Sequence, residues 1–470
     1  MMMKKPSITS AVVDFILNGD TPPADVKKKA LEHIIDGTAV MLAGTRTACV
    51  KTLVAFVREK GGTPASTLLG FNVKASPSDA ALVNGTSGHA DDFDDTQLSS
   101  YPDRTYGLLT HPTVPVLASA LAVGEVADCS GRAVLEAFVV GFEVECKLAE
   151  AINPDHYEGG FHSTGTLGAF GACAASSKLL NLSEEEVRCA LGITASLSSG
   201  IRVNFGTMTK PLHAGMAAAN GVVASMLAKR GFTADREALD GRWGFLNVLG
   251  HGSDPEKIVG RLGTPYVLRH PGASIKMYPC GSLAQPSMDA LLEIVLDENL
   301  EPEDVREIRL RAGPNILDPL RYQSPVNGLQ AKFSLPFGLA CILVKRRAGL
   351  REYTTEVVRS QEMRDAMAKM KTILDTQVAR MGKEKMRSII EVELADGRVI
   401  QRVADTARGT PERPLQRAEL SEKFRACASF VLDAKESEDV LKTISIIEGL
   451  STITELTTRL TGENRSPGLK

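Results

Sequence analysis

The segment GHADDFDDT, residues 88–96, holds the densest group of polar side chains in the chain and is followed by LLTHPTVPV at 108–116. Its four aspartates within five positions could bind a divalent cation, and DDFDD matches the D-D-x-x-D pattern with which all-α isoprenoid synthases hold magnesium on a diphosphate. Such a synthase also needs a second acidic motif and an aromatic-lined pocket. No second motif is evident, and aromatic residues make up only 5% of the chain. A solvated acidic loop or a helix cap is the alternative.

Two glycine-rich segments place basic side chains at the expected start of a helix. In GGFHSTGTLG, 159–168, His162 precedes a run of small residues, where it could donate to an anion at a helix N-terminus or cap the helix. In NFGTMTKPLHAGMAAANG, 204–221, Lys210 precedes a proline, which favours an extended backbone at the lysine, and His213 falls in the first turn of the helix. A lysine in such apolar surroundings could bind a carboxylate or exchange a proton.

A third segment, SIKMYPCGSLAQPSMDALLEI at 274–294, brings Lys276 and Tyr278 ahead of another helix, although a surface lysine and a packing tyrosine are the simpler interpretation of each alone. The patterns G-x-x-x-x-G-K-[ST], G-x-G-x-x-G and G-x-S-x-G do not occur, so nucleotide binding and serine hydrolysis have no support. Histidine, lysine and aspartate side chains without a cofactor motif suit the binding of carboxylates and the transfer of protons. We therefore expect proton abstraction next to a carboxylate, with cations stabilising the enolate-like charge.

Helices are expected to position these segments. Residues 20–44 have apolar side chains at helical spacing, with Thr21 as the predicted N-cap and two prolines in the first turn. Residues 182–195 repeat the pattern behind a capping box formed by Ser183 and Glu186. The glycine-rich segments are crowded with Gly, Ala and Ser, and such small side chains let helices approach closely. A dense core of many helices follows from this composition.

The pattern changes after about residue 263. VREIRLRA at 305–312 alternates apolar and charged side chains, which indicates a half-buried strand. IIEVELADGRVIQRV at 389–403 alternates on both sides of an Asp-Gly pair, which predicts a hairpin. Helical sequence lies between these strands, notably at 361–371.

The sequence therefore predicts a mostly α fold with two parts. Residues 1–265 and 405–470 would form a large all-α helical domain, and residues 266–404 would form a smaller α+β lid domain inserted into it. A cleft between two domains is a common place for a ligand.

Composition narrows the range of partners. The chain has 54 Lys and Arg against 57 Asp and Glu, a net charge of −3, so we expect neither nucleic acid nor a membrane surface as a partner. Its eight cysteines form no C-x-x-C pair and indicate reduced, buried thiols. Asp14 interrupts the apolar N-terminal stretch, and the longest charge-free apolar run, 110–124, is too short to span a bilayer. We expect no signal peptide and a cytoplasmic protein.

Several of these motifs together resemble one known family. The segments stand in the same order as in MmgE/PrpD proteins, over about residues 80–345: GHADDFDDT, HPTVPVLASALAVGE, GFEVECKLAEA, FHSTGTLGAFGACAASSKLL, NFGTMTKPLHAGMAAANGVVASMLA, KMYPC and AKFSLPFGLA. The family includes 2-methylcitrate dehydratase, cis-aconitate decarboxylase and iminodisuccinate epimerase. The resemblance implies an all-α domain with an α+β lid, a homodimer, a small polycarboxylate substrate, and catalysis without a metal or organic cofactor.

The resemblance also implies roles for individual residues. Lys210, Lys276 and His162 would bind and polarise the substrate carboxylates. His111 and Asp92 would transfer the proton. The other positions predicted to contact the substrate are Thr96, His213, Tyr278 and Tyr322.

One position departs from the family pattern. Members commonly carry a histidine about nine residues after the lysine of the lid, whereas this chain has Gln285, which cannot exchange a proton near neutral pH. The predicted activity is that of a lyase that dehydrates or decarboxylates a citrate- or aconitate-like acid. The alternatives are an epimerase of a dicarboxylate such as iminodisuccinate, which begins with the same proton abstraction, and a catalytically inactive relative kept for binding.

Overall fold

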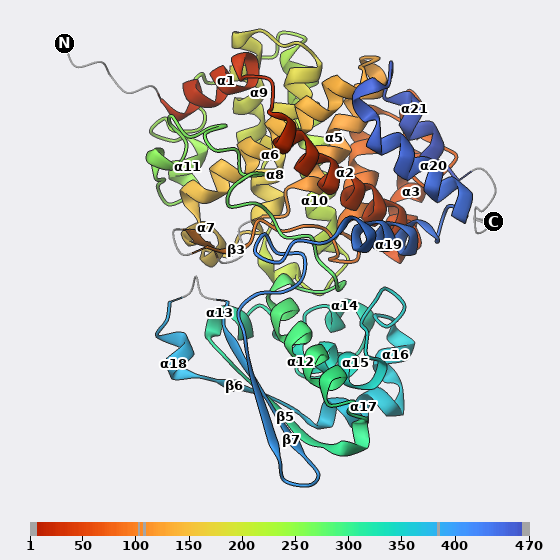
Figure 1. The fold of residues 1–470 in the computed structure, drawn as a ribbon. Coiled ribbons are helices and arrows are strands. Elements are labelled where there is room, and N and C mark those ends of the chain that lie inside the picture. Colours follow the sequence, from red (N-terminus) through yellow and green to blue (C-terminus); the bar gives the residue numbers. More distant parts are fainter. Residues whose placement is uncertain (1–6, 102–103, 107–109, 383–385, 463–470) are drawn as a thin grey trace.

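The computed structural model describes residues 7–101, 104–106, 110–382 and 386–462 of the chain. Residues 1–6, which begin the stretch assessed for a signal peptide, and residues 108–109 of the segment LLTHPTVPV lie outside the described residues. Helices form most of the regular structure, so the prediction of a mostly α fold is confirmed (Figure 1).

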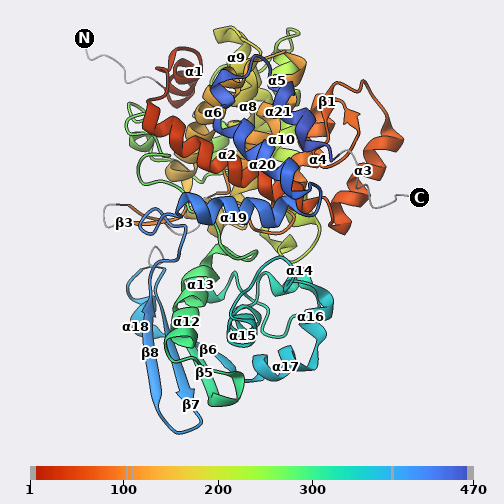
Figure 2. The same cartoon turned by 45° about the vertical axis from the view of Figure 1, so that its right-hand side comes forward.

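The larger part of the molecule is a cluster of helices built around two that are buried along nearly their whole length, α6 (Gly131–Ile152) and α8 (Ser163–Leu179). The C-terminal helix α19 (Arg417–Ala428) returns to pack on α2 (Ala24–Gly44), so both ends of the sequence contribute to one hydrophobic core (Figure 2). Further helices of this part are α1 (Ile8–Asn18), α3 (Ala48–Lys60), α4 (Pro77–His89), α5 (Thr113–Val126), α7 (Asp155–Glu158), α9 (Glu184–Leu197), α10 (Thr209–Ala228), α11 (Phe245–Val248), α20 (Ala434–Ser445) and α21 (Thr454–Thr457). Short strand pairs join β1 (Ser66–Thr67) to β2 (Lys74–Ala75) and β3 (Ser99–Tyr101) to β4 (Arg104–Tyr106).

Two predicted helix starts can be compared with the structure. The prediction of Thr21 as an N-cap is wrong, because α2 begins only at Ala24, with Pro23 in the N-cap position and no side-chain cap. A proline disfavours helical backbone in the residue before it, so the paired prolines delay the start. The capping box of Ser183 and Glu186 is confirmed at the start of α9.

Small residues bring two helices of the site into contact. An ideal Cβ on Gly85 of α4 would lie 2.9 Å from Cα of Gly215 on α10, and one on Gly215 would lie 2.3 Å from the carbonyl oxygen of Leu82. Only glycine permits such an approach of the two backbones. This crossing places the last residue of α4, His89, beside Lys210 in the first turn of α10.

The smaller part has its own hydrophobic core and a four-stranded sheet, whose strand order is β6-β5-β7-β8. The strand at β5 (Val305–Ala312) is confirmed, as is the hairpin of β7 (Ser388–Leu394) and β8 (Val399–Ala404). The helix predicted at 361–371 ends at Ala368, and Met370–Leu374 form the parallel strand β6, which pattern alone did not indicate. The helices of this part are α12 (Gln285–Asp297), α13 (Pro314–Leu317), α14 (Gly328–Ala331), α15 (Leu335–Lys345), α16 (Thr355–Arg359), α17 (Gln361–Ala368) and α18 (Thr376–Ala379).

The second core draws its side chains mainly from residues 278–404, inside the range 266–404 that we propose as the lid domain. In the part of the chain that the structure describes, no single helix is long and apolar enough to cross a membrane. Only α2 and α3 taken together reach that length, and they are bent by 82° at their junction.

Candidate active site

The loop after α4 and the first turn of α10 meet residues of the second part at a buried ionic cluster. Lys210 Nζ and Lys276 Nζ both donate to Asp92 Oδ1, at 3.0 Å and 2.8 Å, and Lys276 also donates to the carbonyl oxygen of Asp92 at 2.8 Å. All three side chains are at most 5% exposed. The prediction of an extended backbone at Lys210 is wrong, because α10 already begins at Thr209 and a proline is tolerated within the first turn of a helix.

A histidine that sequence analysis missed, His89, completes this cluster. Its Nδ1 lies 2.8 Å from Asp94 Oδ2, and its Nε2 lies 2.8 Å from Lys210 Nζ. A carboxylate only accepts and an ammonium only donates, so Nδ1 carries the hydrogen and Nε2 accepts from Lys210. The signal was present in the sequence, since His89 opens the same acidic segment and ends the helix α4.

The tautomer of His111 is fixed in the same way. His111 Nδ1 lies 2.7 Å from the carbonyl oxygen of Asp95, which can only accept a hydrogen bond, and 3.2 Å from Thr96 Oγ1. Nδ1 therefore carries the hydrogen, and Nε2 keeps a lone pair. Asp95 in turn accepts from the backbone and hydroxyl of Thr113, so it caps the start of α5 just behind His111.

His162 and His213 form a second pair of rings beside the first. His162 occupies the N-cap position of α8, but its side chain makes no capping hydrogen bond. Its Nδ1 lies 3.0 Å from Nδ1 of His213, and its ring stacks on His89 with a centroid distance of 5.5 Å. Its Nε2 is buried and has no hydrogen-bond partner in the part of the chain that the structure describes. Of the two functions considered for His162, the geometry disfavours the capping one.

The surroundings set the charge of each group. Burial alone would raise the pKa of Asp92, but Lys210 and Lys276 outweigh it and hold this pKa well below its usual range. Burial, aided by the charge of Lys210, lowers the pKa of His89 and of His162 well below the usual value. Burial likewise lowers the pKa of His111 well below 6.5. At neutral pH the cluster therefore pairs an ionised carboxylate and ammonium groups with neutral imidazoles.

The same residues can be tested as a metal site. Ligand atoms of His89, Asp92, Asp94 and His111 lie within 4.8 Å of one another. However, the ammonium of Lys210 already contacts both His89 and Asp92, and Lys276 contacts Asp92 on the same oxygen. A metal ion would have to displace these hydrogen bonds against two positive charges. The hydrogen bonds of the two lysines therefore disfavour a metal ion at this position.

Each aspartate of DDFDD has a different partner rather than a shared ion. Asp91 pairs with Arg46 and with Lys332 Nζ at 3.0 Å. As described above, Asp94 accepts from His89, and Asp95 caps the start of α5. Lys332 also donates to the carbonyl oxygen of Ala90 at 2.8 Å. The acidic segment is thus a set of separate buried pairs around the site.

Lys423 of α19 is a second lysine that sequence analysis missed, and it binds the loop that follows α4. Its Nζ donates to the carbonyl oxygens of Phe93 at 2.9 Å and Lys276 at 2.8 Å, and it pairs with Asp36 Oδ1 at 2.6 Å. One ammonium therefore fixes both the loop that carries Asp92 and the backbone of Lys276. Lys332 stands in AKFSLPFGLA, a segment of the family resemblance, but was assigned no role, and no pattern singled out the segment of Lys423.

The cluster borders a small cavity of about 20 Å³, room for roughly one water molecule. The lining residues are Asp92, His111, Tyr157, Phe205, Lys210, Gly281, Ser282, Leu283, Pro319, Leu320 and Phe333. They come from both parts of the molecule, so a ligand here would be enclosed between the two cores.

Comparison with known proteins identifies the family of the chain. The family model of the MmgE/PrpD N-terminal domain matches residues 12–258, and that of the C-terminal domain matches residues 278–447. The chain belongs to the MmgE/PrpD family. It is similar to cis-aconitate decarboxylase of Homo sapiens (28% identical, covering 93% of this chain and 90% of that protein), of Mus musculus (27%, covering 93% and 89%) and of Aspergillus terreus (26%, covering 96% of both). At the level of the family these relatives support a lyase-type enzyme.

Most of the residues carried over from the MmgE/PrpD pattern meet in the structure. Asp92, Lys210, Lys276, His111 and His162 form the cluster described above, and His213 adjoins it through His162. Thr96 Oγ1 contacts both His111 Nδ1 and Ser282 Oγ, the latter at 2.6 Å, and so joins the two parts.

The two predicted tyrosines are not brought into this cluster. The hydroxyl of Tyr278 donates to Asp289 Oδ1 at 2.6 Å and accepts from Arg408 at 3.2 Å, within the second core. The hydroxyl of Tyr322 donates to the carbonyl oxygen of Phe205 at 3.1 Å, behind a residue that lines the cavity. Their predicted contact with substrate stays a prediction.

Gln285 stands where family members commonly have histidine, and its side chain is fully engaged with the backbone. Its Oε1 accepts from the amides of Met277 at 3.1 Å and Tyr278 at 3.2 Å, while its Nε2 donates to the carbonyl oxygen of Tyr278 at 2.8 Å. The amide therefore fixes the segment that follows Lys276. Gln285 therefore has a structural role. Its amide cannot exchange a proton near neutral pH.

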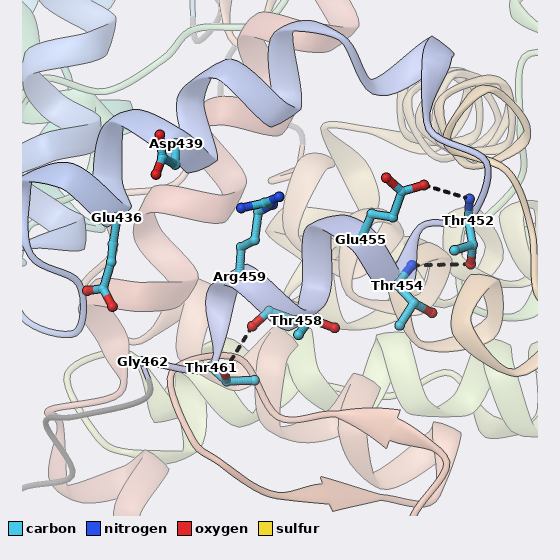
Figure 3. Close-up of a pocket in the computed structure, with 9 residues that line it drawn as sticks. All are labelled: Glu436, Asp439, Thr452, Thr454, Glu455, Thr458, Arg459, Thr461 and Gly462. Atoms are coloured by element: carbon cyan, nitrogen blue, oxygen red, sulfur yellow. Dashed lines mark hydrogen bonds between the residues drawn. The ribbon is translucent and has the colours of Figure 1, made fainter.

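A larger hollow lies on the surface near the C-terminal helices, with a volume of about 580 Å³ (Figure 3). Its ionisable side chains are Glu436, Asp439, Glu455 and Arg459, so acids outnumber bases. Glu455 also accepts from the backbone amides of Ser451 and Thr452, which makes it a local cap. This hollow suits a polycarboxylate less well than the cluster of lysines does.

The site makes one prediction that needs no substrate. Burial and the nearby charge of Lys210 lower the pKa of His213 to about 4. Its ring signal in NMR of histidine-labelled protein should stay constant from pH 7.5 to 5.5 and move only near pH 4, and His213→Gln should remove it. The unfolded chain binds this proton near pH 6.5, so His213 lowers the free energy of unfolding as pH falls from about 6.5 towards 4. A midpoint near 6.5 would contradict the buried, lysine-facing geometry.

Proposed function

We propose that this chain is a cofactor-independent enzyme that transfers a proton at the carbon next to a carboxylate of a small polycarboxylate, and that it acts as a lyase. The observation that carries the proposal is the pair of ammonium groups on Asp92 beside the neutral ring of His111. Such a site attracts an anionic acid and offers a base whose lone pair is available at neutral pH.

The first step follows from the charges. His111 Nε2 takes the proton from the carbon, and the electron pair left behind spreads into the adjacent carboxylate. Lys210 and Lys276 stabilise the negative charge that grows on its oxygens, which lowers the barrier because the ammonium groups are already in place. In a dehydration, a hydroxyl on the next carbon then leaves as water after gaining a proton from the site.

Decarboxylation uses the same groups, but the site then gives a proton to the carbon instead of removing one. Loss of carbon dioxide leaves an electron pair next to a second carboxylate, the two lysines stabilise it, and a protonated donor returns a proton to the carbon. The names of the relatives favour this outcome, since they are cis-aconitate decarboxylases. Epimerisation of a dicarboxylate stays the alternative, and the engaged side chain of Gln285 favours it, because one proton donor common in the family is missing.

Proton NMR in D2O tests the proposal. Incubation with citrate, 2-methylcitrate, cis-aconitate and iminodisuccinate in turn should remove the signal of the proton next to a carboxylate in one of these acids. Loss of water or carbon dioxide would identify the lyase, and exchange of deuterium without a new product would identify the epimerase. Neither exchange nor product with any acid, from folded protein, would contradict the proposed function.

A further inference from the structure

Tyr157 lines the cavity, although nothing in the sequence singled it out. It lies in the short helix α7, and its backbone carbonyl accepts from Arg202 Nη1 at 2.8 Å. The guanidinium of Arg202 also lies over the tyrosine ring, 3.8 Å from its centre. These two contacts hold the ring in place, so its hydroxyl has a fixed direction.

The hydroxyl of Tyr157 is buried and has no hydrogen-bond partner among the described residues. Oδ2 of Asp92, which lines the same cavity, is also buried without a partner. A buried polar atom that makes no hydrogen bond is costly, so native structures rarely leave two of them beside one cavity. Such a pair indicates a ligand atom that satisfies both.

The chemistry of the two atoms differs. Burial raises the pKa of Tyr157 to about 12, so at neutral pH the phenol keeps its proton and can donate. Asp92 is ionised, and its free oxygen can only accept. A hydroxyl group both accepts and donates, whereas a carboxylate of the ligand could satisfy Tyr157 but not Asp92. The cavity has room for about one such oxygen.

We propose that Tyr157 is a specificity-determining residue, which donates to a hydroxyl group of the substrate while that hydroxyl donates to Asp92. This inference rests on the proposed function in its dehydration form, in which the substrate carries a hydroxyl, and adds that the site distinguishes a hydroxy acid from the same acid without its hydroxyl. Arg202 is a positioning residue for the tyrosine ring.

Citrate and tricarballylate test the inference, because they differ only in the hydroxyl. By titration calorimetry the wild-type protein should bind citrate about 10- to 100-fold more tightly than tricarballylate. Tyr157→Phe should bind both acids alike, with its affinity for tricarballylate unchanged. The melting temperature of this variant should stay close to that of the wild type, because the hydroxyl makes no hydrogen bond to another described residue.

Tyr353→Phe is the matched control. Its hydroxyl is also buried without a hydrogen-bond partner among the residues that the structure describes. It lies in the second core and does not line the cavity, so the preference for citrate should persist. Equal binding of the two acids by the wild type would overturn the inference, as would a citrate preference that survives in Tyr157→Phe. Deuterium exchange tests the proposed function separately, and failure of the wild type to bind either acid would overturn both.

Discussion

Replacing Lys210 by methionine should lower kcat/KM by about 100- to 1000-fold while the protein stays folded. The substitution removes the ammonium group that donates to both His89 and Asp92 but keeps nearly the same volume. A donor aimed at developing negative charge commonly contributes an effect of this size. Asp92 keeps its second partner, Lys276, so its carboxylate is not left unpaired in the interior. Steady-state kinetics and thermal unfolding measure the two effects.

Lys147→Met is the control for Lys210→Met. Lys147 is also fully buried and ion-paired, to Glu150 at 3.6 Å, but it does not line the cavity. Loss of stability without loss of activity is expected there. Full activity of Lys210→Met would exclude the proposed site.

Replacing Asp94 by asparagine should lower turnover by about 100- to 10,000-fold, although Asp94 does not line the cavity. Its charge holds the proton on His89 Nδ1 and so leaves Nε2 to accept from Lys210. Without that charge the ring can carry its proton on Nε2, where two donors would then face each other. Loss of the correct histidine tautomer has effects of this order in serine proteases.

The tautomer itself can be observed. In Asp94→Asn, the 15N shifts of His89 should change from those of the Nδ1-protonated form to those of the Nε2-protonated form. The pH–activity profile of the variant should also differ from that of the wild type. Asp79→Asn, at the opposite end of α4, removes a buried charge paired with Lys60 and should leave both readouts unchanged. An inactive Asp94→Asn protein with an unchanged His89 tautomer would refute the explanation.

The sequence allowed much of this site to be predicted because its residues stand in recognisable segments. Lys210 and His162 adjoin small-residue helices, and the resemblance to a family supplied roles that patterns alone left open. The mostly helical fold, the capping box at Ser183 and the hairpin after β7 followed from local rules, since periodicity and turn residues act over a few positions.

What was missed depends on contacts between distant segments. Lys423 is 330 positions from Phe93, whose carbonyl oxygen accepts its hydrogen bond. The sequence pattern of α19 is that of an ordinary surface helix. The strand β6 contains lysine and threonine and follows a helix directly, so only its partner β5 reveals it. Tyr157 is significant because its hydroxyl has no hydrogen-bond partner within the described ranges, and an absent contact cannot be seen in a sequence.

The size of the cavity has a consequence for the rate at which an acid can enter. A tricarboxylate is far larger than one water molecule, so it cannot diffuse into the site as described. The bonds from Lys332 to Asp91 and from Thr96 to Ser282 join the two parts, and we expect them to break when the acid passes between the cores. We therefore expect opening of the protein, rather than collision with the acid, to set the upper limit on the association rate, and this rate to level off as the acid concentration rises.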